Sequence, residues 1–349
     1  MFNFLIAVLL LNNQNVIDTK YAVTIDLSYY EHGVNDEGEE YHYKNWTKST
    51  GIIYKDDDGV WILTAAHIIP HGINHLIENS VFASFHPDLK HNPEEIEFMA
   101  YDRKIDVSLF KFVNQKSANN LPHAKLGKSA NLKIGQQVLS IGSPLPIRFS
   151  ATFGHINNLD ITGFSINQNQ PQLIAHSCMI NAGSSGGPLI NIFNEVIGIN
   201  VMTLGRPNTF NLAVPSDDIK FLLPKLKRGG EIKHQTAGLI GFQYSFMLTD
   251  LNLKEMGIDI RPPQSGIMIL GFKKNSLIEL AGFRKGDIIL SCNGKRMESL
   301  TDLYKMLYLK AEPYEFLKIE IDRYGKKMTL PLLMFDPTEK EIEEENIKL

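Results

Sequence analysis

The chain has 349 residues, a formal net charge of −4 and a pI of about 6.3, and no block of it is rich in lysine and arginine. This charge balance excludes nucleic acid as the principal partner and indicates ordinary solubility. The length predicts about two to three domains. Two cysteines, Cys178 and Cys292, are too few for a disulfide framework or a cysteine-based zinc site, and they leave the cellular compartment undecided.

Residues 1–20 are predicted to be an N-terminal arm or signal segment, apolar from Phe4 to Leu11. A membrane-spanning helix needs about 20 apolar residues, whereas a secretory hydrophobic core needs roughly 7–15. No lysine or arginine precedes the run, and no small-residue cleavage site follows it. We therefore expect either export to the periplasm or a similar compartment, with membrane association through this segment as one form of it, or an apolar arm packed on the fold.

Residues 21–228 consist of short apolar or alternating runs separated by turns, which is typical of an all-β barrel or sandwich. The main predicted strands cover residues 22–27, 51–54, 60–64, 106–112, 137–141, 172–179 and 195–202. Asp58-Gly59 predicts a hairpin turn. A helix capped by Ser216 is expected to run to Leu226. Residues 28–48, rich in acidic and aromatic side chains, match no pattern.

A basic stretch that ends in Gly229-Gly230 marks the domain boundary. Residues 229–335 alternate between strands and an amphipathic helix, which predicts a small α+β domain. The predicted strands cover residues 266–272, 287–292 and 317–322, and the helix covers residues 299–309. The tail, residues 336–349, is charged and is expected to form a solvated helix or to be disordered.

Three segments carry residues suited to nucleophilic catalysis. His67 follows an apolar strand that ends in Thr64-Ala65-Ala66, Asp106 begins another strand, and Ser185 lies in the glycine-dense stretch from Asn181 to Leu189. A serine hydroxyl is a weak nucleophile unless a histidine takes its proton and an acid orients that histidine. The order of these residues therefore predicts a catalytic triad of His67, Asp106 and Ser185.

An oxyanion hole is expected at residues Gly183, Ser184 and Ser185, with the N–H groups of Gly183 and Ser185 converging on the developing charge. Each feature taken alone has a plain structural interpretation, as a strand end or a flexible loop. The sequence Gly-Ser-Ser-Gly-Gly also fits the nucleophile elbow of α/β-hydrolases, which requires a following helix and a later histidine. A hairpin is predicted after Ser185, and only His234 follows, so this alternative is excluded.

Histidines spaced by four residues, His67, His71 and His75, raise the question of a metal site. Pro70 and Gly72 interrupt any helix that would align the three rings. We therefore predict no metal site, and the triad chemistry itself requires no cofactor.

These residues resemble the HtrA/Deg family of serine proteases. Residues 63–69 are similar to its histidine motif, residues 101–109 to its aspartate motif and residues 183–189 to its Gly-Asn-Ser-Gly-Gly block, and the resemblance extends from about Lys48 to Leu333. It implies a mostly β protein with a trypsin-like double β-barrel, residues 21–228, followed by a PDZ domain. It also implies a serine endopeptidase for unfolded or regulatory proteins, active in protein quality control.

The resemblance suggests further features. Family members commonly form homotrimers, for which Tyr21, Tyr29 and Tyr30 are candidate contacts. Ser184 stands where zymogen-activated relatives have an aspartate, so activation by N-terminal cleavage is not expected.

The specificity pocket is expected at Met179 and Ile180, with Asn200, Val201 and Met202 as another wall. None of the five is acidic, which favours aliphatic residues at the cut site. A simple core position is an equally good interpretation of Met179 and Ile180.

Residues 282–294 match the Gly-Leu-x-x-Gly-Asp-x-Ile pattern of PDZ domains closely. The resemblance makes the helix 299–309 one side of a peptide groove. It makes Leu239, Ile240, Gly241 and Phe242 the loop that binds a peptide's terminal carboxylate, although an ordinary turn into a strand is the alternative. Peptide binding there is expected to regulate the protease. The competing hypothesis is a catalytically silent chaperone or peptide-binding protein.

Overall fold

The structure is a computed structural model of the whole chain. It describes residues 18–34, 40–70, 81–144, 148–161, 173–204, 210–232, 239–245, 265–272, 276–297, 300–312 and 314–334. The chain divides into two compact units, of which the first contains most residues up to Gly230 and the second most residues from Glu231. Within the described residues no helix is long and apolar enough to cross a lipid bilayer. The apolar N-terminal run and the charged tail lie outside the described residues.

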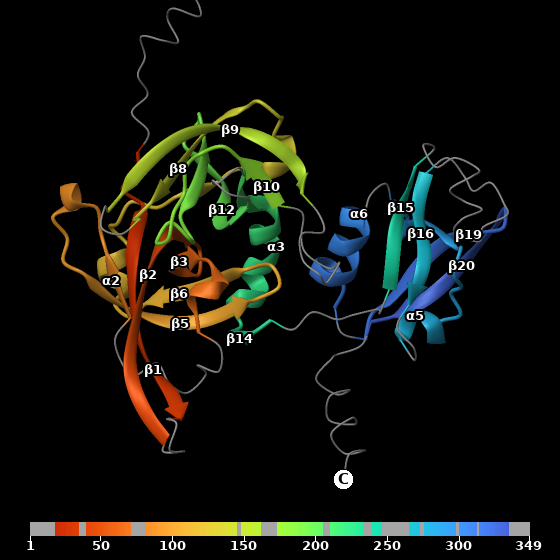
Figure 1. Ribbon diagram of the computed structural model, residues 1–349, viewed down its shortest axis with the longest axis horizontal. Coiled ribbons are helices and arrows are strands. Elements are labelled where there is room, and N and C mark those ends of the chain that lie inside the picture. Colours follow the sequence, from red (N-terminus) through yellow and green to blue (C-terminus); the bar gives the residue numbers. More distant parts are fainter. Residues whose placement is uncertain are drawn as a thin grey trace, which may run out of the picture. The chain divides into compact units, whose positions relative to one another are not determined.

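Six antiparallel strands close the first barrel of the first unit (Figure 1). They are β1 (Ala22–Val34), β2 (Glu40–Asp56), β3 (Gly59–Thr64), β4 (Val81–Ser84), β5 (Glu94–Asp102) and β6 (Val107–Phe112). Neighbours follow the order β5-β4-β1-β2-β3-β6, and a further pairing of β5 with β6 closes the ring. The short strand β14 (Gly230–Glu231) adds to β5. The predicted hairpin joins β2 to β3, but its two turn residues are Asp57 and Asp58, one position before Asp58-Gly59, because Gly59 is already paired with Asp56.

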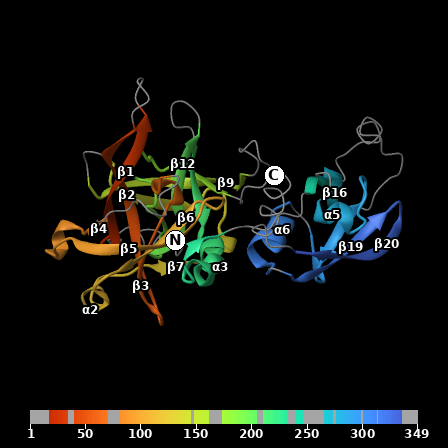
Figure 2. The same ribbon diagram turned by 90° about the horizontal axis from the view of Figure 1, so that it is seen from below.

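The long β1–β2 hairpin explains residues 28–48, which the sequence pattern left unplaced. The two strands pair continuously from Ala22 with Ile52 to Val34 with Glu40. Strand β4 pairs with β1 only over residues 24–27, so the outer part of the hairpin projects beyond the barrel (Figures 1 and 2).

The second barrel of this unit is built in the same way. Its strands are β8 (Gln137–Gly142), β9 (Ser150–Ile161), β10 (Leu173–His176), β11 (Pro188–Asn191), β12 (Glu195–Leu204) and β13 (Phe210–Pro215). The order is β11-β8-β9-β10-β13-β12, and pairing of β11 with β12 closes the ring. The short strand β7 (Lys125–Leu126) adds to β12. Two closed barrels of this kind confirm the predicted trypsin-like double barrel.

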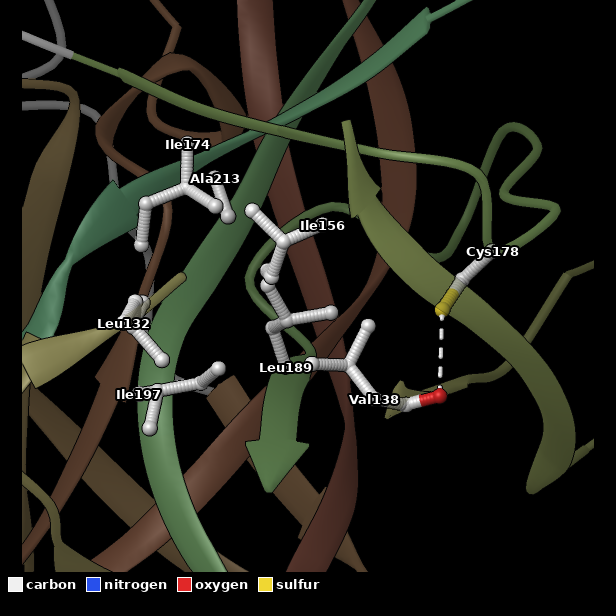
Figure 3. Packing of buried hydrophobic residues seen from close by; sticks show 8 residues of the cluster. All are labelled: Leu132, Val138, Ile156, Ile174, Cys178, Leu189, Ile197 and Ala213. Carbon is white, nitrogen blue, oxygen red and sulfur yellow. Dashed lines mark hydrogen bonds between the residues drawn. The ribbon is translucent and has the colours of Figure 1, made fainter. Parts of the chain in front are cut away.

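Aliphatic side chains from different strands fill the second barrel (Figure 3). The buried cluster consists of Leu132, Val138, Ile156, Ile174, Cys178, Leu189, Ile197 and Ala213. The Cys178 thiol joins it and donates to the carbonyl of Val138 at 3.7 Å. Both Cys178 and Cys292 are buried free thiols, and burial raises the pKa of Cys178 to about 12 and that of Cys292 to about 11.

Short helices connect the strands of the first unit. They are η1 (Ala66–Ile68), η3 (Pro87–Leu89), α2 (Gln115–Ala118), η4 (Ser129–Asn131) and α3 (Ser216–Leu226). Helix α3 has the predicted bounds, with Ser216 as its first residue. The Ser216 hydroxyl donates to the carbonyl of Gly127 at 2.9 Å, so it anchors the helix to a neighbouring loop.

Two tyrosines differ from the expectation that they contact other subunits. Tyr21 is buried, and its hydroxyl donates to Asn194 Oδ1 at 3.1 Å within the same chain. Tyr29 is also buried. Their rings therefore pack inside the fold, and the side chain of Tyr30 lies outside the described residues.

The second unit is a small sheet with helices, as predicted. Its elements are β15 (Leu239–Ser245), β16 (Ser265–Phe272), α5 (Leu277–Leu280), β17 (Ile288–Cys292), β18 (Lys295–Arg296), α6 (Leu300–Tyr304), η5 (Lys305–Lys310), β19 (Phe316–Arg323) and β20 (Lys326–Leu333). The strand order is β15-β16-β17-β19-β20, with β18 on β17. The predicted helix 299–309 corresponds to α6 and the π-helical turns of η5.

A buried ion pair holds the Gly282–Asp287 loop of this unit. The Asp287 carboxylate is almost inaccessible to solvent, and it accepts bonds from Arg323 Nε and Arg323 Nη2 at 2.7 Å each. The backbone N–H of Arg284 donates to the same carboxylate at 2.8 Å. A bidentate pair of this kind fixes geometry as well as contributing energy, so the motif that predicted the domain also stabilises its loop.

Candidate active site

His67 and Asp106 form a doubly bonded pair in the first barrel. The apolar strand β3 ends at Thr64, and buried Ala65 and Ala66 carry the chain into the η1 turn that holds His67. Asp106 Oδ2 lies 2.8 Å from His67 Nδ1, and Asp106 Oδ1 accepts the backbone N–H of His67 at 2.8 Å. Two contacts to one carboxylate fix the ring orientation, and with a proton on Nδ1 the ring leaves Nε2 as the basic atom.

The backbone at Asp106 is unusual. Its φ of 64° places it in the left-handed region, where the small polar residue Asp is tolerated. Asp106 therefore lies just before β6 rather than inside the strand, as the prediction 106–112 had it. Buried Asp102 shapes the turn, because its Oδ1 accepts the N–H groups of Lys104 and Ile105 at 3.0 Å each.

Opposing influences act on the pKa of the His67 ring. Burial lowers the pKa of His67, while the hydrogen bond from the ring to Asp106 and the charge of Asp106 raise it. The net shift is upward from 6.5. A neighbouring carboxylate stabilises the imidazolium, which is the form that a general base reaches once it has taken a proton.

Ser185 lies in a turn that carries two free backbone donors. The N–H of Ser184 donates to the carbonyl of Asn181 at 2.8 Å, and Gly183, with φ of 97°, is the third residue of this turn. A positive φ at the third position defines a type II turn and favours glycine. Among the described residues, the N–H groups of Gly183 and Ser185 have no hydrogen-bond acceptor.

This geometry divides the three predicted oxyanion residues. Gly183 and Ser185 offer unpaired N–H groups on either side of the turn, whereas the N–H of Ser184 is occupied by Asn181. The N–H groups expected to act as oxyanion donors, those of Gly183 and Ser185, are thus the two unpaired ones, and Ser184 lies between them with its own N–H occupied. Ser184 is a turn-closing residue, and its side chain is buried against Gly142, where a Cβ would lie 2.5 Å from the Ser184 Oγ.

The turn continues into a very crowded glycine. Gly186 has φ of 83°, and a Cβ added to it would lie 1.9 Å from Thr64 Oγ1 and 2.2 Å from the Thr50 carbonyl. The Gly186 N–H donates to the carbonyl of Asn200 at 2.8 Å. The pattern Gly-x-Ser-Gly-Gly thus reflects both backbone conformation and lack of space.

The predicted specificity residues differ in their access to a substrate. Ile180, Asn200 and Val201 are buried, and Asn200 Nδ2 donates to Ser140 Oγ at 2.9 Å and to the Gly187 carbonyl at 3.0 Å. Met179 is 66% exposed and Met202 is 37% exposed. Asn200 therefore holds the Ser185 loop in place, and Met179 and Met202 are the members of the set with side-chain surface for a ligand.

Sequence reasoning missed several residues that support the site. The hydroxyl of Ser108 donates to the carbonyl of Ala65 at 3.0 Å, and so ties β6 to the chain just before His67. Asp102 was visible only as part of the aspartate motif. Ser49 and Thr50 contact the Ser185 turn from more than 130 residues away in the chain, so no local signal could reveal them.

The structure describes the remaining predicted sites only in part. Leu239, Ile240, Gly241 and Phe242 are the first residues of β15, with a register irregularity between Ile240 and Gly241. Helix α6 lies near β15, so a strand and a helix border the predicted groove. His71 and His75 lie outside the described residues, and in the described part no three acidic, histidine or cysteine side chains gather as a metal site.

Comparison with known proteins gives both domains. Residues 49–199 match the model of the trypsin-like peptidase domain, and residues 255–333 match that of the PDZ domain. The chain is 28% identical over 301 residues to the serine protease Do-like HtrB of Bacillus subtilis, covering 83% of this chain and 62% of that protein. It is 31% identical to the serine protease HTRA1 of Xenopus tropicalis, covering 71% of this chain and 52% of that protein.

Two further comparisons agree with these. The periplasmic serine endoprotease DegP of Escherichia coli is 28% identical, with 78% of this chain and 53% of DegP covered. The solved structure of the HtrA-type protease AlgW with a decapeptide has a TM-score of 0.68 at 17% identity, and covers 93% of this chain and 98% of that chain. The chain thus spans between half and two thirds of the length of these curated relatives. It belongs to the HtrA/Deg family, with a trypsin-like peptidase domain followed by a PDZ domain.

Proposed function

We propose that this chain is a serine endopeptidase that uses His67, Asp106 and Ser185 as its catalytic triad. His67 Nε2 takes the proton of the Ser185 hydroxyl as that oxygen attacks the peptide carbonyl, and then gives it to the leaving amine. Asp106 holds the ring and stabilises the imidazolium. The N–H groups of Gly183 and Ser185 bind the oxyanion of the tetrahedral intermediate, where each such donor is worth roughly 3 kcal/mol.

The doubly bonded His67–Asp106 pair carries this proposal. A structural histidine needs one partner, whereas here the same carboxylate accepts the backbone N–H and contacts Nδ1, both at 2.8 Å. This arrangement leaves Nε2 directed away from the acid, as a general base requires. Relatives named as serine proteases and endoproteases support the same chemistry.

The test compares cleavage of unfolded casein by wild type and by Ser185→Ala. We expect the substitution to abolish cleavage while leaving the melting temperature unchanged, since the Ser185 side chain is not part of the buried core. Equal cleavage by both proteins would reject the assignment and favour the competing hypothesis of a silent chaperone. Because the base must be neutral and its pKa is raised, kcat/KM is expected to fall on acidification with a midpoint above 6.5.

Substrate preference follows from the exposed members of the specificity set. Met179 and Met202 present apolar, adaptable surface, and no acidic side chain belongs to the set. We infer a preference for aliphatic residues at the cut site of unfolded or regulatory proteins. A peptide library with Val, Lys and Asp at the cut position measures this, and a preference for lysine would contradict it.

We further infer that C-terminal peptides bind beside β15 and regulate cleavage. AlgW, a structural neighbour, has been solved with a decapeptide and with a tripeptide. An extended peptide adding to β15, next to α6, would use the strand edge and a terminal hydrophobic carboxylate. Peptides that end in a hydrophobic carboxylate are expected to change the turnover of casein, and the same peptides with an amidated terminus serve as the control.

Location and assembly are also inferred by analogy. One relative is named a periplasmic endoprotease, so we infer that this chain too acts after export. A homotrimer is the proposed assembly, for which light scattering of the purified protein gives the mass directly.

A further inference from the structure

Two hydroxyl side chains of the first barrel hold the catalytic turn of the second barrel. Thr50, on β2, is fully buried, and its Oγ1 donates to the carbonyl of Gly183 at 2.7 Å. Its neighbour Ser49 is also buried, and its Oγ donates to the carbonyl of Ser185 at 2.7 Å. The backbone N–H of Thr50 donates to that same Ser185 carbonyl at 2.9 Å.

The two carbonyls that are held adjoin the two free donors. The Ser185 N–H belongs to the peptide between Ser184 and Ser185, and the peptide units on both sides of it have their carbonyls anchored. The Gly183 N–H belongs to the peptide directly before the anchored Gly183 carbonyl. In a type II turn the central peptide has the opposite orientation to that in a type I turn, so the direction of the Gly183 N–H depends on which turn is held.

Thr50 is itself held in place from the other side. Its Oγ1 accepts the backbone N–H of Ser143 at 2.9 Å, and Ser143 Oγ in turn accepts the hydroxyl of Thr24 at 2.9 Å. The Thr50 hydroxyl has one proton to donate, and the Ser143 N–H occupies an acceptor position, so that proton is left for Gly183. The network thus directs the proton of the Thr50 hydroxyl to the Gly183 carbonyl.

We propose that Thr50 and Ser49 are positioning residues for the oxyanion site, which they act on through the carbonyls of Gly183 and Ser185. This inference rests on the proposed function, and it identifies the residues that hold the N–H groups of Gly183 and Ser185 in the arrangement that binds the oxyanion. An apolar side chain would fill the same space between the barrels, but it would leave the Gly183 carbonyl without this donor and the turn free to rotate. The hydroxyls of Ser49 and Thr50 therefore contribute to stabilising the transition state and not to binding the substrate.

The decisive variants are Thr50→Val, which keeps the shape and removes the hydroxyl, and Thr50→Ser, which keeps the hydroxyl. We expect Thr50→Val to lower kcat by about 10- to 100-fold with KM changed by less than about twofold, because loss of an oxyanion donor costs about 10²–10³-fold and a misdirected donor costs less. Thr50→Ser is expected to restore kcat to within about threefold of wild type.

A second measurement separates positioning from a general loss of structure. A peptide aldehyde forms a tetrahedral adduct with Ser185, so its affinity should fall in Thr50→Val by the same factor as kcat. A product peptide with a free carboxylate, which forms no adduct, should bind as it does to wild type. The matched control is Ser216→Ala. It also removes a buried hydroxyl that donates to a backbone carbonyl, that of Gly127 at 2.9 Å, but this bond does not involve the Ser185 turn, so kcat should be unchanged.

The outcomes are distinguishable. If Ser185→Ala abolishes cleavage while Thr50→Val cleaves at the wild-type rate, the positioning role is overturned and the proposed function stands. If Thr50→Ser is as defective as Thr50→Val, the hydroxyl is irrelevant and the role is again overturned. If Thr50→Val does not fold, Ser49→Ala is the deciding variant, because it keeps the backbone bond from Thr50 to Ser185. A lower kcat of Ser49→Ala at unchanged KM supports the positioning role, and an unchanged kcat rejects it. Cleavage by Ser185→Ala rejects both proposals together.

Discussion

A buried histidine in the second barrel makes the stability of this protein sensitive to acid. His176 ends β10 with no accessible surface, and neither of its ring nitrogens has a hydrogen-bond partner among the described residues. Burial lowers the pKa of His176 to about 4, and the nearby Asn200 amide opposes only part of that shift. Since an unfolded histidine titrates near 6.5, the folded state resists a proton that the unfolded state accepts.

The size of the effect follows from the two pKa values. Above pH 6.5 the ring is neutral in both states, so it makes no pH-dependent contribution. As the pH falls from 6.5 to about 4, the free energy of unfolding drops by about 1.4 kcal/mol per pH unit, or roughly 3 kcal/mol over the whole interval. His176→Leu replaces the ring with an apolar side chain of similar size and removes the two unpaired nitrogens, so it should abolish this loss.

The assay is urea unfolding of the full chain at several pH values between 7.5 and 4.5. Both tryptophans, Trp46 and Trp61, lie in the first unit, so their fluorescence follows the domain that contains His176. We expect the stability advantage of His176→Leu over wild type to grow by about 1.4 kcal/mol per pH unit below 6.5. His155→Gln, which removes an exposed histidine of β9, is the matched control. Parallel curves for wild type and His176→Leu would refute the reasoning.

Three other substitutions test separate parts of the structure. Asp106→Asn should lower kcat by about 10⁴-fold in a peptide assay, because the amide favours the wrong tautomer of His67, and a loss below tenfold would argue against the proposed triad. Gly186→Ala should prevent accumulation of soluble protein, as measured on expression, whereas Gly135→Ala, with a similar φ of 82° and no atom within 4 Å of the added Cβ, should cost about 1 kcal/mol and remain soluble. Asp287→Asn should destabilise the PDZ domain by about 3 kcal/mol in urea, by breaking its buried ion pair, and an unchanged midpoint would contradict the role given to that pair.

Much of the fold follows from local patterns in the sequence. The short alternating runs predicted the strands because each barrel strand buries one face, and Asp58-Gly59 predicted the existence of its hairpin but placed the turn one residue late. The boundaries were less accurate. The predicted strand 172–179 ends at His176, because the chain leaves the sheet to reach the Ser185 turn, and Asp106 leaves its strand to reach His67.

The candidate site was predictable only in part, for a physical reason. His67, Asp106 and Ser185 each sit in a short motif with its own local conformation, and such motifs are visible in one sequence. Contacts between the barrels have no local signature. Nothing in the sequence around Thr50 indicates that its hydroxyl bonds to Gly183, because that contact depends on how the two barrels pack. The N–H of Ser184 is occupied because of the turn type at residues 181–184, which the residues permit but do not require.

The bonds from β2 to the Ser185 turn join residues that are 133 and 136 positions apart. Contacts with such wide separation can form only after the long chain segment between them has been brought together, which costs loop-closure entropy. A growing chain that has emerged from the ribosome as far as the first barrel therefore carries His67 and Asp106 without a usable serine, and one that has just gained Ser185 still lacks a settled turn. The Ser185 turn is therefore complete only when both barrels have folded, and the proposed peptidase activity is expected to begin no earlier than that.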